Sequence, residues 1–182
     1  KRIVAAEGLP GFTAKQIAQW LYVKKVESIE DMTNLSKVAR ARLAEKYEVG
    51  LVEYAGMQIS TDGTKKYLFP VKCSHLRGLN RSCDGSAPDD RLEESAVEAV
   101  MIPDDDRATL CVSSQAGCRM GCRFCASTIG GKVRDLLPSE LLGQIIAAEK
   151  DSGERVSNIV MMGIGEPLDN FDNVVRFLRL VN

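Results

Sequence analysis

The chain has 182 residues, of which 45% are hydrophobic and 27% charged, and its 24 Lys and Arg against 25 Asp and Glu give a formal net charge of −1. This composition is typical of a globular chain and excludes a disordered protein, a strongly basic nucleic-acid wrap and an acidic tail. No apolar run approaches the ~20 residues that span a bilayer, and the N-terminus lacks the apolar segment of a secretory signal. We therefore expect a cytoplasmic protein of one or two domains. Because the first residue is Lys1 rather than Met, we also expect a fragment of a longer protein.

Residues 1–50 predict a small helical accessory domain. Ile17 and Trp20 lie on one helix face, after a candidate N-cap at Thr13. A second helix is expected to begin near Ser36. The surplus of basic side chains here is compatible with RNA contact, but such a surplus more often marks a solvated face.

Residues 51–105 predict a β-hairpin and linker segment. The dipeptide Asp62-Gly63 stands between two strand-like runs, which is a hairpin signal, and strand character returns over 96–102. Between them lies a polar insert over 73–95. The insert contains two cysteines and the single histidine, which are Cys73, Cys83 and His75. Zinc binding by these three is conceivable, but no fourth ligand is evident, so an insertion with incidental cysteines is favoured.

Residues 106–182 alternate strand, loop and helix, which predicts parallel βα units and an α/β fold class. We expect a strand over 109–113, a helix from 138 to 150 that starts at a proline, and an apolar strand over 158–162 that is buried on both faces. This length holds about two units at roughly 30 or more residues each, whereas a complete barrel needs about 250. The sequence therefore predicts a partial TIM-like (βα) barrel, preceded by the helical domain and the short β segment.

Three of the six cysteines cluster with the spacing Cys-x3-Cys-x2-Cys, at Cys118, Cys122 and Cys125. Three thiolates on one loop suit a [4Fe–4S] cluster, for which cysteine is the usual ligand. No fourth cysteine follows, so one iron would stay open to bind a small molecule. Zinc is the alternative, although structural zinc sites use four ligands. Three disulfides would suit a small secreted scaffold instead.

The cysteine spacing, with Phe124 before the last cysteine, resembles the signature of the radical S-adenosylmethionine (SAM) superfamily. In that superfamily the open iron binds the methionine moiety of SAM, and one electron cleaves SAM to a 5′-deoxyadenosyl radical. The stretch 163–167, Gly-Ile-Gly-Glu-Pro, is similar to the superfamily turn that holds the methionine ammonium. The resemblance implies that Gly165 and Glu166 bind SAM. Glycine allows close approach of a ligand, and a carboxylate suits an ammonium.

Further stretches resemble the RlmN/Cfr family; they are 62–67, 97–103, 106–115, 161–168 and the region of Trp20. These enzymes methylate carbon 2, or carbon 8 in the Cfr branch, of an adenosine in large-subunit ribosomal RNA. We favour the RlmN-like branch. The resemblance implies 23S rRNA and also tRNA as substrates, and a flavodoxin-like or ferredoxin-like reductant.

The resemblance also implies roles for Glu98 and Cys111. In the family, one SAM methylates a cysteine near the C-terminus, and a second SAM supplies the radical that joins this methyl carbon to the base. Cys111 matches the cysteine that resolves the protein–RNA crosslink as a disulfide, and Glu98 matches the proposed general base. Without the resemblance, Cys111 would be a buried apolar cysteine and Glu98 a solvent-facing strand carboxylate. The methyl-carrying cysteine is expected beyond residue 182, so we expect the fragment alone to be inactive.

Two rival functions remain open. One is another radical SAM reaction, such as glycyl-radical activation, against which the stretch 107–115 argues. The other is a non-catalytic iron–sulfur electron carrier or an RNA-binding module. A carrier would show no SAM-dependent change in its cluster spectrum, and a binding module would bind RNA without a cluster.

Overall fold

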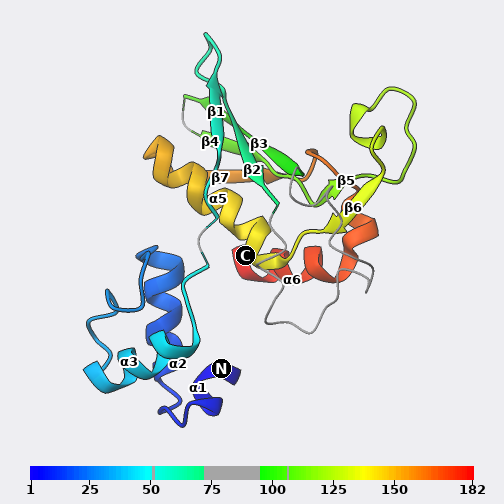
Figure 1. Ribbon diagram of the computed structural model, residues 1–182. Helices are drawn as coiled ribbons and strands as arrows, with labels where there is room; N and C mark the ends of the chain where they lie inside the picture. Colours follow the sequence, from blue (N-terminus) through cyan, green and yellow to red (C-terminus); the bar gives the residue numbers. More distant parts are fainter. Residues whose placement is uncertain (51, 72–94, 106) are drawn as a thin grey trace. The chain divides into compact units, whose positions relative to one another are not determined.

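The computed structural model describes residues 1–50, 52–71, 95–105 and 107–182. Its contacts divide the chain into two compact units, Lys1–Leu51 and Val52–Asn182, each with its own hydrophobic core (Figure 1). The cysteines and histidine of the polar insert lie outside the described residues, so their zinc hypothesis stays a prediction. Within the described ranges, no helix has the length and apolar character needed to cross a membrane.

The first unit is helical throughout its regular elements. Its helices are α1 (Arg2–Ala6), α2 (Thr13–Ala18), a π-helical turn η1 (Gln19–Val23) and α3 (Lys37–Lys46). Its buried core consists of Ile29, Met32, Leu35 and Leu43, against which Ile17, Trp20 and Leu21 pack. The expected helical face is therefore present. The helix begins as an α-helix at Thr13 and continues as a π-helix from Gln19.

The two helix starts in this unit differ in how they are capped. Helix α3 begins next to Ser36 as predicted, and Ser36 caps it, because its Oγ accepts a hydrogen bond from the Ala39 amide at 3.1 Å. The prediction for Thr13 is wrong. The N-cap position of α2 is Phe12, which makes no side-chain cap, and Thr13 is the first helical residue, with only 4% of its surface exposed. Burial of Thr13 in the fold thus overrides its capping preference.

The second unit is built on a five-stranded sheet in the order β1-β2-β3-β4-β7. The strands are β1 (Gly56–Ile59), β2 (Lys65–Pro70), β3 (Ala96–Asp104), β4 (Arg107–Cys111) and β7 (Val156–Val160). All neighbours are antiparallel except β4 and β7, which are parallel. The predicted hairpin joins β1 to β2, and Gly63 there has a φ of +84°, which glycine adopts without strain.

The prediction that the last strand is buried on both faces is wrong. In the described sheet β7 has a neighbour on one side, and its Ser157 and Asn158 are exposed. The strand also starts and ends two residues earlier than predicted. The apolar run thus predicted that a strand forms here, but it did not predict the position of this strand in the sheet.

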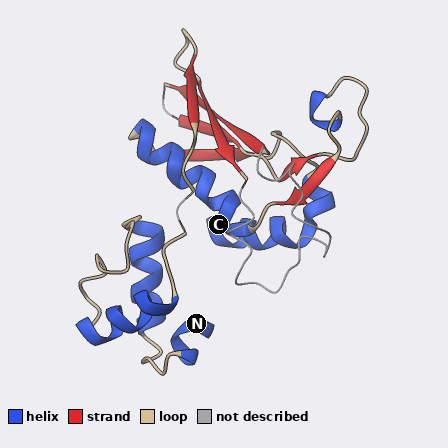
Figure 2. Ribbon diagram, in the orientation of Figure 1, coloured by secondary structure: helices blue, strands red, loops and turns tan. Residues whose placement is uncertain are grey.

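Helix α5 (Pro138–Ser152), between β4 and β7, packs against one face of this sheet, and α6 (Phe171–Val181), after β7, packs against α5 (Figure 2). Helix α5 begins where the sequence predicts, with Pro138 in its first turn and the Glu140 carboxylate accepting from the Leu137 amide at 2.8 Å. It ends at Gly153, whose φ is +73°. The contacting core side chains are Leu141, Ile145, Ala148, Val174 and Phe177 from the helices, and Val97, Ala99, Met101 and Leu110 from the sheet.

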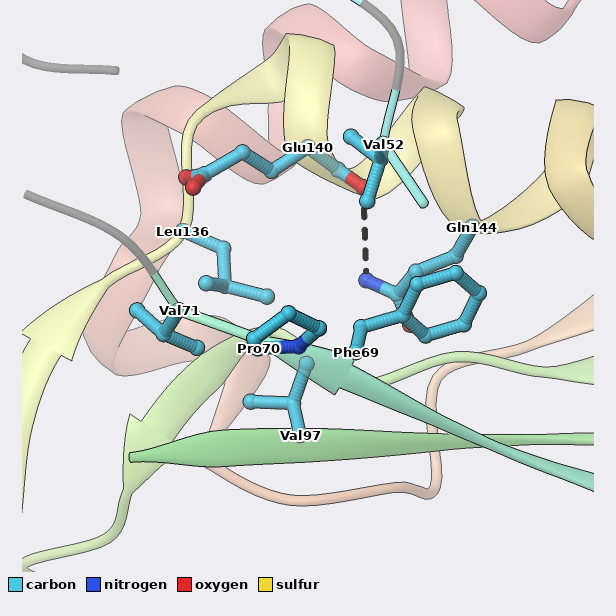
Figure 3. Close-up of a pocket in the computed structure, with 8 residues that line it drawn as sticks. All are labelled: Val52, Phe69, Pro70, Val71, Val97, Leu136, Glu140 and Gln144. Carbon is cyan, nitrogen blue, oxygen red and sulfur yellow. Dashed lines mark hydrogen bonds between the residues drawn. The ribbon is translucent and has the colours of Figure 1, made fainter. Parts of the chain in front are cut away.

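A small pocket lies in this core between the sheet and α5 (Figure 3). Its lining is Val52, Phe69, Pro70, Val71, Val97, Leu136, Glu140 and Gln144. The two polar members are engaged within the fold: Arg134 donates to the Glu140 carboxylate at 2.6 and 2.8 Å, and Gln144 bonds both backbone groups of Ser113 at 3.0 Å. The pocket is therefore a feature of core packing.

Candidate functional site

A short antiparallel ribbon holds the cysteine loop at both of its ends. It consists of β5 (Gln115–Gly117) and β6 (Lys132–Asp135) (Figure 1). The Cys118 amide donates to the Gly131 carbonyl at 3.2 Å and closes the loop. Gly117 has a φ of +68°, and a Cβ there would overlap the Gly131 carbonyl oxygen, so only glycine fits where the loop leaves β5.

The three cysteines of this loop are free thiols with different exposure. Cys118 is buried, Cys125 is half-buried and Cys122 is exposed. Hydrogen bonds from the side chain and backbone of Ser127 lower the pKa of the Cys125 thiol, which favours the thiolate. Among the described residues, no three His, Cys, Asp or Glu side chains are gathered closely enough to hold a metal ion. The structure thus fixes the ends of the loop without bringing the thiols together. Three free thiols on one loop nevertheless have the chemistry that a cluster needs.

The Gly-Glu-Pro turn sits directly on the strand that leads into the cysteine loop. The Ile164 carbonyl accepts from the Gln115 amide at 3.2 Å, and the Ile164 amide donates to Ser113 Oγ at 2.8 Å. Both glycines are required by this contact. A Cβ on Gly163 would lie 2.6 Å from Ser113 Oγ, and a Cβ on Gly165, where φ is +98°, would lie 2.5 Å from Gln115 Cβ. The two glycines therefore allow the backbone of the turn to pack closely against the backbone of residues 113–115.

Glu166 is half-buried and is held at its backbone and its side chain. Its amide donates to Gln115 Oε1 at 2.9 Å, and its Oε1 accepts from the Leu168 amide at 3.0 Å. The carboxylate thus stands at the start of the short 3₁₀ helix η4 (Pro167–Asn170), next to the ribbon that carries the cysteines. An anionic group in this place suits an ammonium ligand.

Behind the turn lies a buried polar network that the sequence analysis missed. Asp169 Oδ2 accepts from Gln115 Nε2 and Lys132 Nζ, each at 2.8 Å, and its Oδ1 pairs with Arg119. Gln115 Nε2 also donates to Asp135 at 2.7 Å. Hydrogen bonds from Lys132 first, then Gln115 and Arg119, hold the pKa of Asp169 far below its usual range. The only sequence signal was the position of Asp169 three residues after Glu166.

Glu98 and Cys111 lie on the sheet face that α5 and α6 do not cover. Strand pairing places Lys66 opposite Val100, and Val100 opposite Cys111, while Glu98 is two residues from Val100 on β3. Lys66 Nζ pairs with Glu98 Oε1 at 3.0 Å. The structure thus puts both predicted catalytic residues on one face, together with a lysine that the sequence analysis did not single out.

Comparisons with known proteins agree with this geometry. Residues 3–49 match the family model RlmN_N, described as the ribosomal RNA large subunit methyltransferase N-terminal domain. The chain is 47% identical over 172 residues to a probable dual-specificity RNA methyltransferase RlmN of Lachnoclostridium phytofermentans, covering 94% of this chain and 43% of the relative. A protein of the same name from Lachnospira eligens is 45% identical over 180 residues, covering 98% of this chain and 46% of the relative.

The crystal structure of a radical SAM methyltransferase from Sphaerobacter thermophilus is also similar. It matches with a TM-score of 0.77 and 34% identity, over 99% of this chain and 48% of that one. The chain thus spans about half the length of the relatives that it matches. Over the half of these proteins that it spans, the chain is similar to members of the RlmN family.

Proposed function

We propose that the whole protein is a radical SAM methyltransferase that methylates carbon 2 of an adenosine in 23S rRNA, and of a tRNA, through a methyl-cysteine intermediate. The names of the relatives support RNA methylation, and the structural neighbour supports radical SAM chemistry. One observation carries the proposal for this chain: the Gly-Glu-Pro turn is seated on the strand that enters the cysteine loop.

The fold is proposed to be the start of a TIM-like radical SAM barrel. The parallel pairing of β4 with β7, with α5 between them and α6 after β7, supports two βα units. We propose residues 1–50 as a helical accessory domain, 51–105 as the β segment with its insert over 73–95, and 106–182 as the start of the core. A cytoplasmic location and a flavodoxin-like or ferredoxin-like reductant follow from the proposed activity.

Cys118, Cys122 and Cys125 would hold the [4Fe–4S] cluster, and Gly165 and Glu166 would hold SAM. When bound, the cluster supplies the electron that cleaves SAM. The lowered pKa of the Cys125 thiol and the fixed ends of the loop support the ligand set. Gly165 lets the turn lie directly against Gln115, and the Glu166 carboxylate would face the ammonium of the methionine moiety.

Glu98 would take the ring proton of the adenine, and Cys111 would release the RNA by forming a disulfide with the methyl-carrying cysteine. These roles are supported by the position of both residues on one face of the sheet. They are also supported by the short distance along the chain from Cys111, at the end of β4, to Gln115, where the strand that enters the cysteine loop begins. The Lys66 ammonium holds the Glu98 carboxylate on that face. A charged pair exposed on an uncovered sheet face is able to meet a substrate from solvent.

The proposal is tested by electron paramagnetic resonance of the anaerobically reconstituted, reduced chain with and without SAM. We expect a [4Fe–4S] signal that changes when SAM is added. The triple variant of Cys118, Cys122 and Cys125 to alanine should lose the signal, and Glu166→Gln should keep the signal and weaken the SAM response. If the cluster signal does not change on addition of SAM in the complete protein either, the protein is an electron carrier. Zinc in place of iron would exclude the radical reaction.

A further inference from the structure

Gln115 is fully buried, and every polar atom of its side chain is used. Its Oε1 accepts from the Glu166 amide at 2.9 Å, while its Nε2 donates to Asp135 at 2.7 Å and to Asp169 at 2.8 Å. The amide has one possible orientation, because the flipped form would set its NH₂ against the Glu166 N–H and its oxygen against two carboxylates. Gln115 thus fixes the backbone of Glu166 from within the fold.

Asp169 receives donors from both ends of the cysteine loop. Arg119 directly follows the first cysteine, and Lys132 opens β6 after the loop, and both pair with the Asp169 carboxylate. Asp169 is itself bound to the turn, since its amide donates to the Glu166 carbonyl at 3.0 Å. With 6% of its side chain exposed, this carboxylate depends on its donors, because an unpaired buried charge is costly.

We infer that Gln115 and Asp169 are positioning residues that set the Glu166 turn at a fixed place relative to the cysteine loop. The inference rests on the proposed function of that site and adds to it the residues that join its two halves. A cofactor that must touch both the loop and the turn requires a fixed spacing between them, since outer residues that orient a ligand set control its affinity. Neither residue is assigned a contact with the cofactor.

A second carboxylate in the same unit, which is partly buried and also paired with a lysine, provides a matched control. Asp151, at the end of α5, accepts from Lys65 at 2.8 Å and from Tyr54 and Tyr67 at 2.9 Å each. This cluster joins α5 to β2 and touches neither the loop nor the turn. Asp151→Asn therefore removes one charge from a lysine-bound carboxylate, as Asp169→Asn does, without changing the proposed link.

The test compares the unaltered chain with Asp169→Asn, Gln115→Leu and Asp151→Asn. Before cluster reconstitution, hydrogen exchange of the Glu166 amide reports the position of the turn directly. We expect faster exchange in Asp169→Asn, although that variant keeps the acceptor at Gln115, and unchanged exchange in Asp151→Asn. After reconstitution, we expect iron content to stay at the level of the unaltered chain and SAM affinity to fall about 10-fold in the first two variants only.

The outcomes separate the inference from the proposed function. Unaltered Glu166 exchange in Asp169→Asn would overturn the inference, whether or not the chain binds SAM. Equal losses of SAM affinity in Asp169→Asn and Asp151→Asn, in step with their melting temperatures, would also overturn it, because the role would then be structural. An unaltered chain with no cluster or no SAM response, but with the expected exchange difference, would reject the proposed function and keep the link between the turn and the loop.

Discussion

Asp169 remains charged in a nearly buried position because Lys132, Arg119 and Gln115 all donate to it. Its pKa is therefore held far below the usual range of a carboxyl. A group whose pKa is lower in the folded than in the unfolded state stabilises the fold above its unfolded pKa and loses this effect as the pH falls. The sequence could not predict this set of hydrogen bonds, because Gln115 and Asp169 are 54 residues apart.

This charge predicts how acid acts on the Asp169→Asn variant. The free energy of unfolding should be lower in the variant than in the unaltered chain at pH 7. The difference should shrink as the pH falls from about 5 to about 2, because the unfolded form of the unaltered chain binds a proton at Asp169 while the folded form stays charged, which favours unfolding. Urea denaturation across this range measures it, and a difference that does not depend on pH would contradict the assigned ion pairs.

Adjacent lysines on opposite sheet faces test the role of Glu98. Lys66 pairs with Glu98 at 3.0 Å on the uncovered face, and Lys65 pairs with Asp151 at 2.8 Å on the other. In the complete protein, Glu98→Gln should reduce methyl transfer to RNA by about 100-fold or more, as loss of a general base does. Lys66→Met should reduce it by less, and Lys65→Met should leave the rate unchanged. A rate equally affected by both lysine variants would argue against a role for the Glu98 pair.

Elements with a local cause were predictable from the sequence. The Asp62-Gly63 turn, the start of α3 near Ser36 and the start of α5 at Pro138 each depend on residues within a few positions, and each prediction is confirmed. The prediction for Thr13 failed, because Thr13 is buried as the first residue of the helix and Phe12 takes the N-cap position.

The candidate site likewise contains local features, which the sequence predicts, and long-range contacts, which it does not. The cysteine spacing and the Gly-Glu-Pro turn are visible as short motifs, so their residues could be proposed in advance. The seat of the turn on Ser113 and Gln115, and the Lys66–Glu98 pair, join residues that are at least 32 positions apart. Only strand order and register bring such residues together, and no local pattern encodes these. Whether the three cysteines bind a cluster stays a prediction.

Stability of the ribbon and its cysteine loop should depend more strongly on Gly117 than on Gly121. Gly117 and Gly121 have φ values of +68° and +71°, so alanine is strained at both, but only at Gly117 would the new Cβ overlap backbone. We expect Gly121→Ala to cost about 1 kcal/mol of stability and Gly117→Ala clearly more, with separation of β5 from β6. Urea denaturation gives the two values, and equal costs would contradict the close approach of Gly131.

At the scale of the molecule, the two units have separate cores. A unit of this size is only marginally stable by itself. Leu43→Ala removes a buried side chain with 3% exposure from the first core, which costs about 2–5 kcal/mol. We expect this variant to lose the first unit and keep the second.

Amide spectra by nuclear magnetic resonance would show this loss as dispersed signals that disappear for residues 1–50 only. Val38→Ala is the control, since Val38 lies on the same helix with 79% exposure and should leave all signals in place. Loss of both sets of signals in Leu43→Ala would show that the units unfold together.

The hairpin between β1 and β2 projects from the sheet at the end opposite the ribbon with the cysteine loop (Figure 1). Strand register agrees, because Lys65 next to this turn pairs with Met101, whereas Glu98, whose carbonyl is bound by Ser113, pairs with Leu68 farther along β2. Thr61 at the tip is exposed. The tip is therefore a natural attachment point for a fluorophore or a surface tether, and a chain immobilised there would present its cysteine loop outward to an electrode or to RNA in solution.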